Sequence, residues 1–118
     1  MIRVSRSLIV IGLLIGGIPV WHETSSGADG NSGQGRVLYE KLCAVCHGPQ
    51  GKGDGPAGKA LVPPPADFTS AASKKKSTAE LQRIIEQGKL GTAMIAWKGQ
   101  LSVNDIADLV AYLNSIRK

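Results

Sequence analysis

The sequence is poor in aromatic side chains and in residues that bind metals. Its 118 residues include one Phe, two Tyr and two Trp, and only two Cys, two His and two Met. With so few rings, a small domain has little to fill its core, and this shortage favours a bulky apolar group bound inside it. No segment alternates polar and apolar residues with a period of two, which argues against a sheet-based fold.

An excess of charge of one sign is also missing. From Asp29 onward, twelve Lys and Arg stand against eight Asp and Glu, a net charge of +4. This surplus is small and dispersed. It therefore argues against nucleic acid as a partner, and it is compatible with docking on an acidic protein surface.

The N-terminal segment has the pattern of a secretory signal. Arg3 and Arg6 precede an uncharged run from Leu8 to Val20, which is shorter than the roughly 20 residues of a membrane span. Small residues before Asp29 predict cleavage after Ala28. We therefore assign 1–28 to a signal peptide or, if uncleaved, an N-terminal membrane anchor, 29–34 to a flexible spacer and 35–118 to the folded domain. His22 lies in the signal segment, so no ligand role is expected for it.

The folded domain is predicted to be all-α. Apolar residues at spacings of three and four predict a first helix over 33–46. The Gly- and Pro-rich segment that follows excludes long helices. Ser77–Glu80 has the pattern of a capping box that opens a second helix, which Gly88 ends. A last amphipathic helix begins at Ser102 or Asn104 and runs to the chain end.

Residues 43–47 read Cys-Ala-Val-Cys-His, and four functions compete for this motif. Structural zinc needs four Cys or His ligands and catalytic zinc needs three with matched geometry, but beyond residue 28 the chain has only Cys43, Cys46 and His47. A thioredoxin-like pair requires a preceding strand. A structural disulfide is compatible with export but leaves the adjacent histidine unexplained.

The fourth function is haem attachment, for which Cys-x-x-Cys-His is the c-type signature. Each thiol adds to one vinyl group of the porphyrin, and the next residue, His47, then points at the iron. Met94 is the one methionine beyond residue 28, in a Gly-bounded loop. A lone methionine usually fills a gap in a core, but histidine with methionine is also the ligand pair of electron-carrying haem.

With these residues, 35–118 resembles a class I bacterial mono-haem cytochrome c. The resemblance implies a small cytochrome c-like fold of three main helices and long loops around one covalent haem c. It makes Cys43 and Cys46 the thioether sites, and His47 and Met94 the axial ligands of the iron.

The resemblance also assigns supporting roles. Gly35 and Tyr39 match the positions at which the family's first helix crosses its last, and Leu109 and Tyr112 match the partner positions. Pro63–Pro65 lie where the family uses a proline carbonyl to accept the second ring N–H of the proximal histidine. Which of the three prolines does so stays open.

One position departs from the pattern. Many relatives have proline directly after the ligand methionine, whereas this chain has Ile95. Because proline fixes φ, isoleucine predicts a looser bond between Met94 and iron. Trp97 is expected either to pack in the core or to contact a haem propionate.

Two further segments have competing interpretations. GDGPAGKA (53–60) matches the phosphate-binding loop pattern, but Ala60 replaces the required Ser or Thr and no strand precedes it, so a turn at the haem edge is expected. Lys74–Lys76 are either a solvated loop or, with Lys52, Lys89 or Lys98, a surface that steers an acidic redox partner.

These observations favour an exported electron carrier of the bacterial periplasm rather than an enzyme. One haem c would cycle between Fe(II) and Fe(III), and redox proteins would be the partners. A haem subunit of a larger dehydrogenase or oxidase complex is the first alternative. A haem sensor or peroxidase is less favoured because it needs an open sixth position. Contact with a membrane is expected only if the N-terminal segment stays uncleaved.

Overall fold

The computed structural model describes residues 29–118, so the predicted signal segment and its cleavage site lie outside the described part. The helices are α1 (Ser32–Leu42), α2 (Ala44–His47), the 3₁₀ helix η1 (Gly58–Ala60), α3 (Ala71–Lys74), α4 (Thr78–Gln87) and α5 (Val103–Ile116). Within the described residues there is no β-strand, only an isolated bridge between Lys98 and Leu101. The all-α class with three main helices, α1, α4 and α5, is confirmed.

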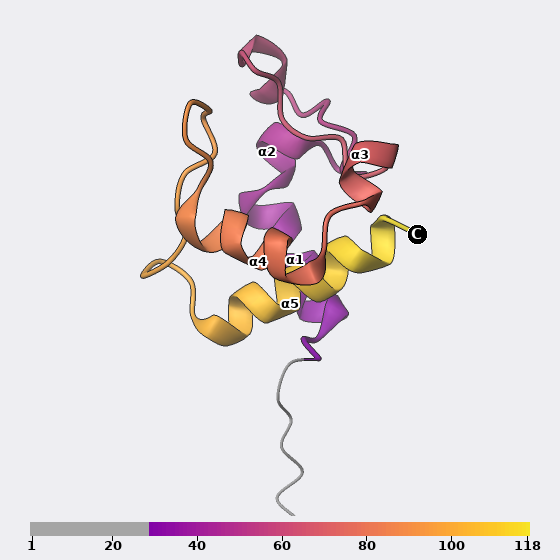
Figure 1. The fold of residues 1–118 in the computed structure, drawn as a ribbon, viewed down its shortest axis with the longest axis vertical. Coiled ribbons are helices and arrows are strands. Elements are labelled where there is room, and N and C mark those ends of the chain that lie inside the picture. Colours follow the sequence, from indigo (N-terminus) through magenta and orange to yellow (C-terminus); the bar gives the residue numbers. More distant parts are fainter. Residues whose placement is uncertain (1–28) are drawn as a thin grey trace, which may run out of the picture.

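The first helix differs from its predicted form in two ways. It begins at Ser32, because the Asn31 side chain accepts hydrogen bonds from the next residues and caps the first turn. Residues 32–34, which the domain assignment places in the flexible spacer, are therefore helical, and the helix starts one residue before the predicted 33. The helix also ends at Leu42, and Cys43 separates it from the short α2. The break turns α2 out of the axis of α1, as Figure 1 shows.

The crossing of α1 and α5 is the most extensive contact between helices. Gly35 is essential to it, because a Cβ there would collide with the backbone carbonyl of Asp108 and lie 2.9 Å from the Tyr112 Cβ. Tyr39 is fully buried, and its ring centroid lies 5.2 Å from that of Tyr112. Leu109 is buried beside them, so all four expected residues meet at the crossing.

The caps of the later helices differ in part from expectation. Ser77 Oγ accepts a hydrogen bond from the Glu80 N–H at 3.1 Å, but the Glu80 carboxylate pairs with Lys76 at 3.3 Å instead of returning to Ser77. Only half of the predicted capping box is therefore present. The complete box lies at α5, where Ser102 and Asp105 bond each other reciprocally.

The hydrophobic core lies between α1, α4 and α5 and contains two buried aromatic rings. Its buried residues are Tyr39, Phe68, Leu81, Ile85, Ile106, Leu109, Val110 and Leu113. In Figure 1, the long loop 48–70 lies above α2, and the long loop 88–102 lies to the left of α4. None of the described helices is long and apolar enough to cross a membrane.

Candidate functional site

A cavity of about 420 Å³, here called the central cavity, lies between the helices and the two loops. Its volume falls in the range of ligand pockets, about 300–1,000 Å³. Aliphatic side chains of α4 and α5, including Leu81, Ile85 and Leu113, form much of its wall. Cys43, Cys46, His47 and Met94 all line it, and they are the four predicted site residues.

A single helical turn positions the first three of these side chains. The N–H groups of Cys46 and His47 both donate to the carbonyl of Cys43, at 3.1 and 2.9 Å. Gly48, with φ of +81°, ends the turn, and its carbonyl accepts a 2.6 Å hydrogen bond from the buried Tyr39 hydroxyl. The cysteines are free thiols, so the structure holds no disulfide at the motif.

His47 is held on two sides. Its Nδ1 lies 3.1 Å from the carbonyl oxygen of Ala66, and its ring stacks on Phe68 with centroids 4.7 Å apart and planes 22° from parallel. In the tautomer that donates from Nδ1, the lone pair is on Nε2. A metal-binding histidine needs this arrangement, in which the second nitrogen fixes the orientation of the ring.

The acceptor differs from our expectation, which placed it within Pro63–Pro65. The carbonyl of Pro65 packs instead against Gly53, where a Cβ would come within 2.6 Å of its oxygen. The next carbonyl, that of Ala66, faces His47. The prolines still line the central cavity, so they contribute to its wall rather than to the histidine bond.

The protonation states suit ligation rather than thiol exchange. Burial lowers the pKa of His47, although the bond to Ala66 opposes this effect, so the imidazole is neutral at pH 7. Burial, with a smaller contribution from Cys46, raises the pKa of Cys43 to about 11. Reactive redox cysteines have lowered pKa values, so this environment disfavours the thioredoxin-like interpretation.

The loop after α4 brings Met94 to the cavity. Gly88 (φ +72°) ends the helix, and the N–H of Lys89 donates to the Met94 carbonyl at 3.0 Å. The Met94 N–H donates to Thr92 Oγ1 at 3.1 Å, and the Trp97 N–H donates to the carbonyl of Ile85 at 3.0 Å. The methionine is thus fixed through its backbone, while Ile95 beside it is 55% exposed.

Trp97 packs against the core and also lines the central cavity. Of the lysine run, Lys76 lines the cavity, while Lys74 and Lys75 are exposed. The segment resembling a phosphate-binding loop forms turns and η1 rather than a strand-to-helix junction. Among residues 29–118, no group of three or more His, Cys, Asp or Glu could hold a metal ion.

Two residues of the site were missed in the sequence. Ala66 acts through its backbone, so its side chain gives no signal. Phe68 is the one phenylalanine of the chain, and it is buried. A lone large ring shortly after a proline run could have been identified as a packing partner of the cavity.

Comparison with known proteins assigns the family. The sequence pattern of the family described as "Cytochrome C oxidase, cbb3-type, subunit III" matches residues 30–113. The chain belongs to the c-type cytochromes. It is 31% identical over 90 residues to cytochrome c-554(547) of Halothiobacillus neapolitanus, covering 75% of this cytochrome and 99% of that protein.

Solved structures of c-type cytochromes share the fold. "KustC0563 c-type cytochrome" has a TM-score of 0.57 at 26% identity, with 71% of this chain and 98% of that one covered. "C-type cytochrome NirC" has a TM-score of 0.53 at 28% identity, with 70% and 87% covered. A chain of the "Kuenenia stuttgartiensis reducing HAO-like protein complex Kustc0457/Kustc0458" has a TM-score of 0.63 at 30% identity. There the match covers 70% of this chain but 41% of the longer one.

Membership means that this cytochrome carries covalently bound haem c and transfers electrons, as its family does, usually without catalysing a reaction of its own. The central cavity fits such a group. It combines apolar walls, two free thiols at the attachment spacing, a neutral imidazole and a thioether.

Proposed function

We propose that this cytochrome is an exported, periplasmic electron carrier with one haem c. Cys43 and Cys46 would hold the haem by thioether bonds, and His47 and Met94 would bind its iron. One observation carries the proposal: a local motif and a methionine from a distant loop line the same apolar cavity.

The surrounding residues have separate tasks. Ala66 and Phe68 orient the proximal imidazole, and the aliphatic walls from α4 and α5 exclude water. When bound, haem supplies an iron that alternates between Fe(II) and Fe(III). With Met94 as a ligand, the iron would be closed to small reactants, so no enzymatic activity is expected.

Loading of the haem is tested by export in a host that attaches haem c. We expect the mature protein to gain the mass of exactly one haem, to retain it after denaturation and to start at Asp29. C43A and C46A should each weaken or abolish retention. The control K75A, on the exposed linker after α3, should retain it fully. A colourless product at peptide mass would contradict the proposal.

The distal ligand needs its own test. The ferric protein should show the weak charge-transfer band of methionine-ligated haem, and M94A should lose this band while keeping the covalent haem. An oxidised protein without the band would instead favour an open site, as in a sensor or peroxidase.

The proposed partner is a redox protein with an acidic docking surface. The basic residues that support it are exposed and lie on several segments: Lys52, Lys59, Lys74, Lys75, Lys89 and Lys98. Because attraction between exposed charges is screened by salt, the electron-transfer rate should fall steeply as ionic strength rises. An unchanged rate would contradict acidic docking.

A second candidate is a haem subunit of a larger dehydrogenase or oxidase complex. Two findings favour it: the matched family is described as an oxidase subunit, and one similar chain is part of a larger complex. Gel filtration of the protein from its native source separates the two functions. A free monomer supports the carrier, and co-elution with larger subunits supports the complex.

A further inference from the structure

The charged side chains of the central cavity are concentrated at one place. Apart from the motif, its lining contains two lysines, Lys76 and Lys89, and no carboxylate. The other walls are almost entirely aliphatic, aromatic or proline. A ligand with an anionic end could therefore meet a cation at one border of the cavity only.

That border continues onto the outer face of α4. A second, shallow hollow there shares Lys76, Ile84 and Lys89 with the central cavity and adds Glu80 and Arg83. We call these five residues the α4 border. Three cations against one carboxylate give it a net charge of +2, and Ile84 lies among them.

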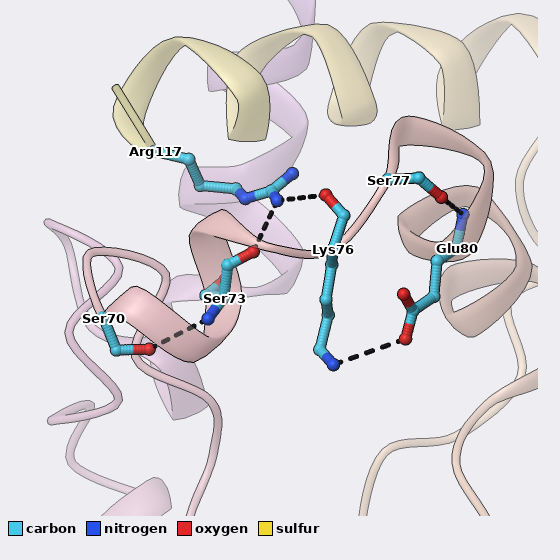
Figure 2. A network of polar contacts seen from close by, with 6 residues as sticks. All are labelled: Ser70, Ser73, Lys76, Ser77, Glu80 and Arg117. Atoms are coloured by element: carbon cyan, nitrogen blue, oxygen red, sulfur yellow. Dashed lines mark hydrogen bonds and ion pairs between the residues drawn. The ribbon is translucent and has the colours of Figure 1, made fainter.

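Lys76 is positioned from both ends. Arg117 is 8% exposed and donates through Nη2 to the backbone carbonyls of Ser73 and Lys76. It therefore fixes the linker between α3 and α4 to the end of α5, as Figure 2 shows. At the other end, the Lys76 ammonium lies 3.3 Å from Glu80 Oε1, and the side chain is 33% exposed. A lysine normally free to move is here presented at the cavity edge.

We propose that the α4 border binds the propionate carboxylates of the haem, with Lys76 as the main cation and Lys89 as the second. The inference rests on the proposed haem site. A haem is an apolar disc with two carboxylates at one edge, and carboxylates are not buried against aliphatic walls without partners. The border offers cations there, whereas Glu80 shares Lys76 and limits how strongly it binds. Arg117 is a positioning residue that acts through the linker.

Infrared spectroscopy of the holoprotein tests the assignment. Haem labelled with ¹³C at the propionate carboxyls identifies their bands in reduced-minus-oxidised difference spectra. We expect K76Q to move these bands, K76R to restore them, and K75Q to leave them at wild-type positions. K75Q is the matched control, because it removes the same charge from the exposed neighbouring position.

Redox titration at pH 7 provides a second measurement. A cation near the haem favours the reduced, less positive state, so K76Q should have a lower midpoint potential than K75Q. E80Q should shift the potential upward, because it frees Lys76 from its competing carboxylate.

Failure of the propionate assignment can be distinguished from failure of the proposed haem site. Propionate bands unchanged in K76Q, or moved equally in K75Q, would overturn the subsite. Bands that move in W97F but not in K76Q would assign the propionates to Trp97 and also overturn it. None of these variants touches the proposed attachment residues, so covalent haem should be present in all of them. Failure of the wild type to hold haem would instead reject the proposed function.

Discussion

The helix crossing and the two loops of this cytochrome are stabilised in different ways. The crossing of α1 and α5 depends on side-chain burial and on close backbone approach at Gly35. Of the eight buried hydrophobic core residues, only Phe68 comes from a loop. The loops are held mainly by backbone hydrogen bonds, such as those from Gly53 to His47 at 2.8 Å and from Phe68 to Gly51 at 2.7 Å.

The crossing therefore serves as the scaffold of the domain, and the loops form part of the wall of the central cavity. The crossing packs α1 and α5 directly against each other, although Tyr39 and Leu109 also line the central cavity. The loops contribute apolar side chains, including those of Met94 and Pro63–Pro65, to the wall of the central cavity. Their order should therefore depend on what fills the cavity, and the following changes probe each region in turn.

The largest loss of stability is expected at the crossing of α1 and α5. In G35A, the added Cβ would overlap the Asp108 carbonyl, so the helices must separate, at a cost of about 3 kcal/mol. Urea unfolding of the holoprotein measures the loss. G33A is the control, because an added Cβ there comes near Asn31 Oδ1 alone, at 3.2 Å, and alanine is favoured in helices. Equal stability of the two variants would show that the crossing does not depend on close approach.

A smaller loss of stability is expected at Tyr39, which links the helix crossing to the Cys-x-x-Cys-His motif. Y39F removes the buried hydrogen bond to the Gly48 carbonyl. That oxygen keeps its bond from the Gly51 N–H at 3.1 Å, so the expected cost is that of one hydrogen bond, about 1 kcal/mol. The same unfolding measurement applies. The Tyr112 hydroxyl makes no hydrogen bond within the described residues, so Y112F should change stability by less than about 0.5 kcal/mol.

The role of loop 88–102 can be tested at Ile95, the residue directly after Met94. Its N–H makes no hydrogen bond within residues 29–118, so proline can replace it without losing one. I95P should restrict the unbound loop and strengthen Met94 ligation by about 0.4–1 kcal/mol. Imidazole titration of the ferric protein should then show an affinity about two- to fivefold lower than in wild type. I95A is the control, and an unchanged affinity in I95P would contradict a looser loop.

The smallest effect concerns the cap of α5. Hydrogen bonds from the Ser102 hydroxyl and N–H lower the pKa of Asp105. A carboxylate with a lowered folded-state pKa stabilises the protein above its unfolded pKa, about 3.9, and this contribution is lost as the pH falls through the folded value. D105N should therefore melt at a lower temperature than wild type at pH 7, and the difference should disappear near pH 2. A difference independent of pH would mean that the charge is not involved.

Local signals in the sequence predicted much of the fold. The end of α4 at Gly88 follows from one residue, and the crossing partners of Gly35 and Tyr39 follow from the family pattern. Haem attachment, with axial roles for His47 and Met94, stays a prediction, although the structure places these residues around one cavity.

The sequence could not predict which of several possible hydrogen-bond partners a side chain would choose. Glu80 could bond Ser77 or Lys76, and the structure pairs it with Lys76. Three proline carbonyls and that of Ala66 could accept from His47; the structure places Ala66 there, while the Pro65 carbonyl faces Gly53. The break at Cys43 is also invisible in the pattern, because apolar spacing continues across it.

The partial burial of Cys43 bears on how the protein matures. In the folded chain this thiol is partly buried and lines the central cavity. Burial raises its pKa to about 11, so the protonated form, a poor nucleophile, prevails at pH 7. The thioether proposed for Cys43 should therefore form on a nascent, still open polypeptide, with docking of α5 as a later step. Chains that fold prematurely would then resist the maturation machinery.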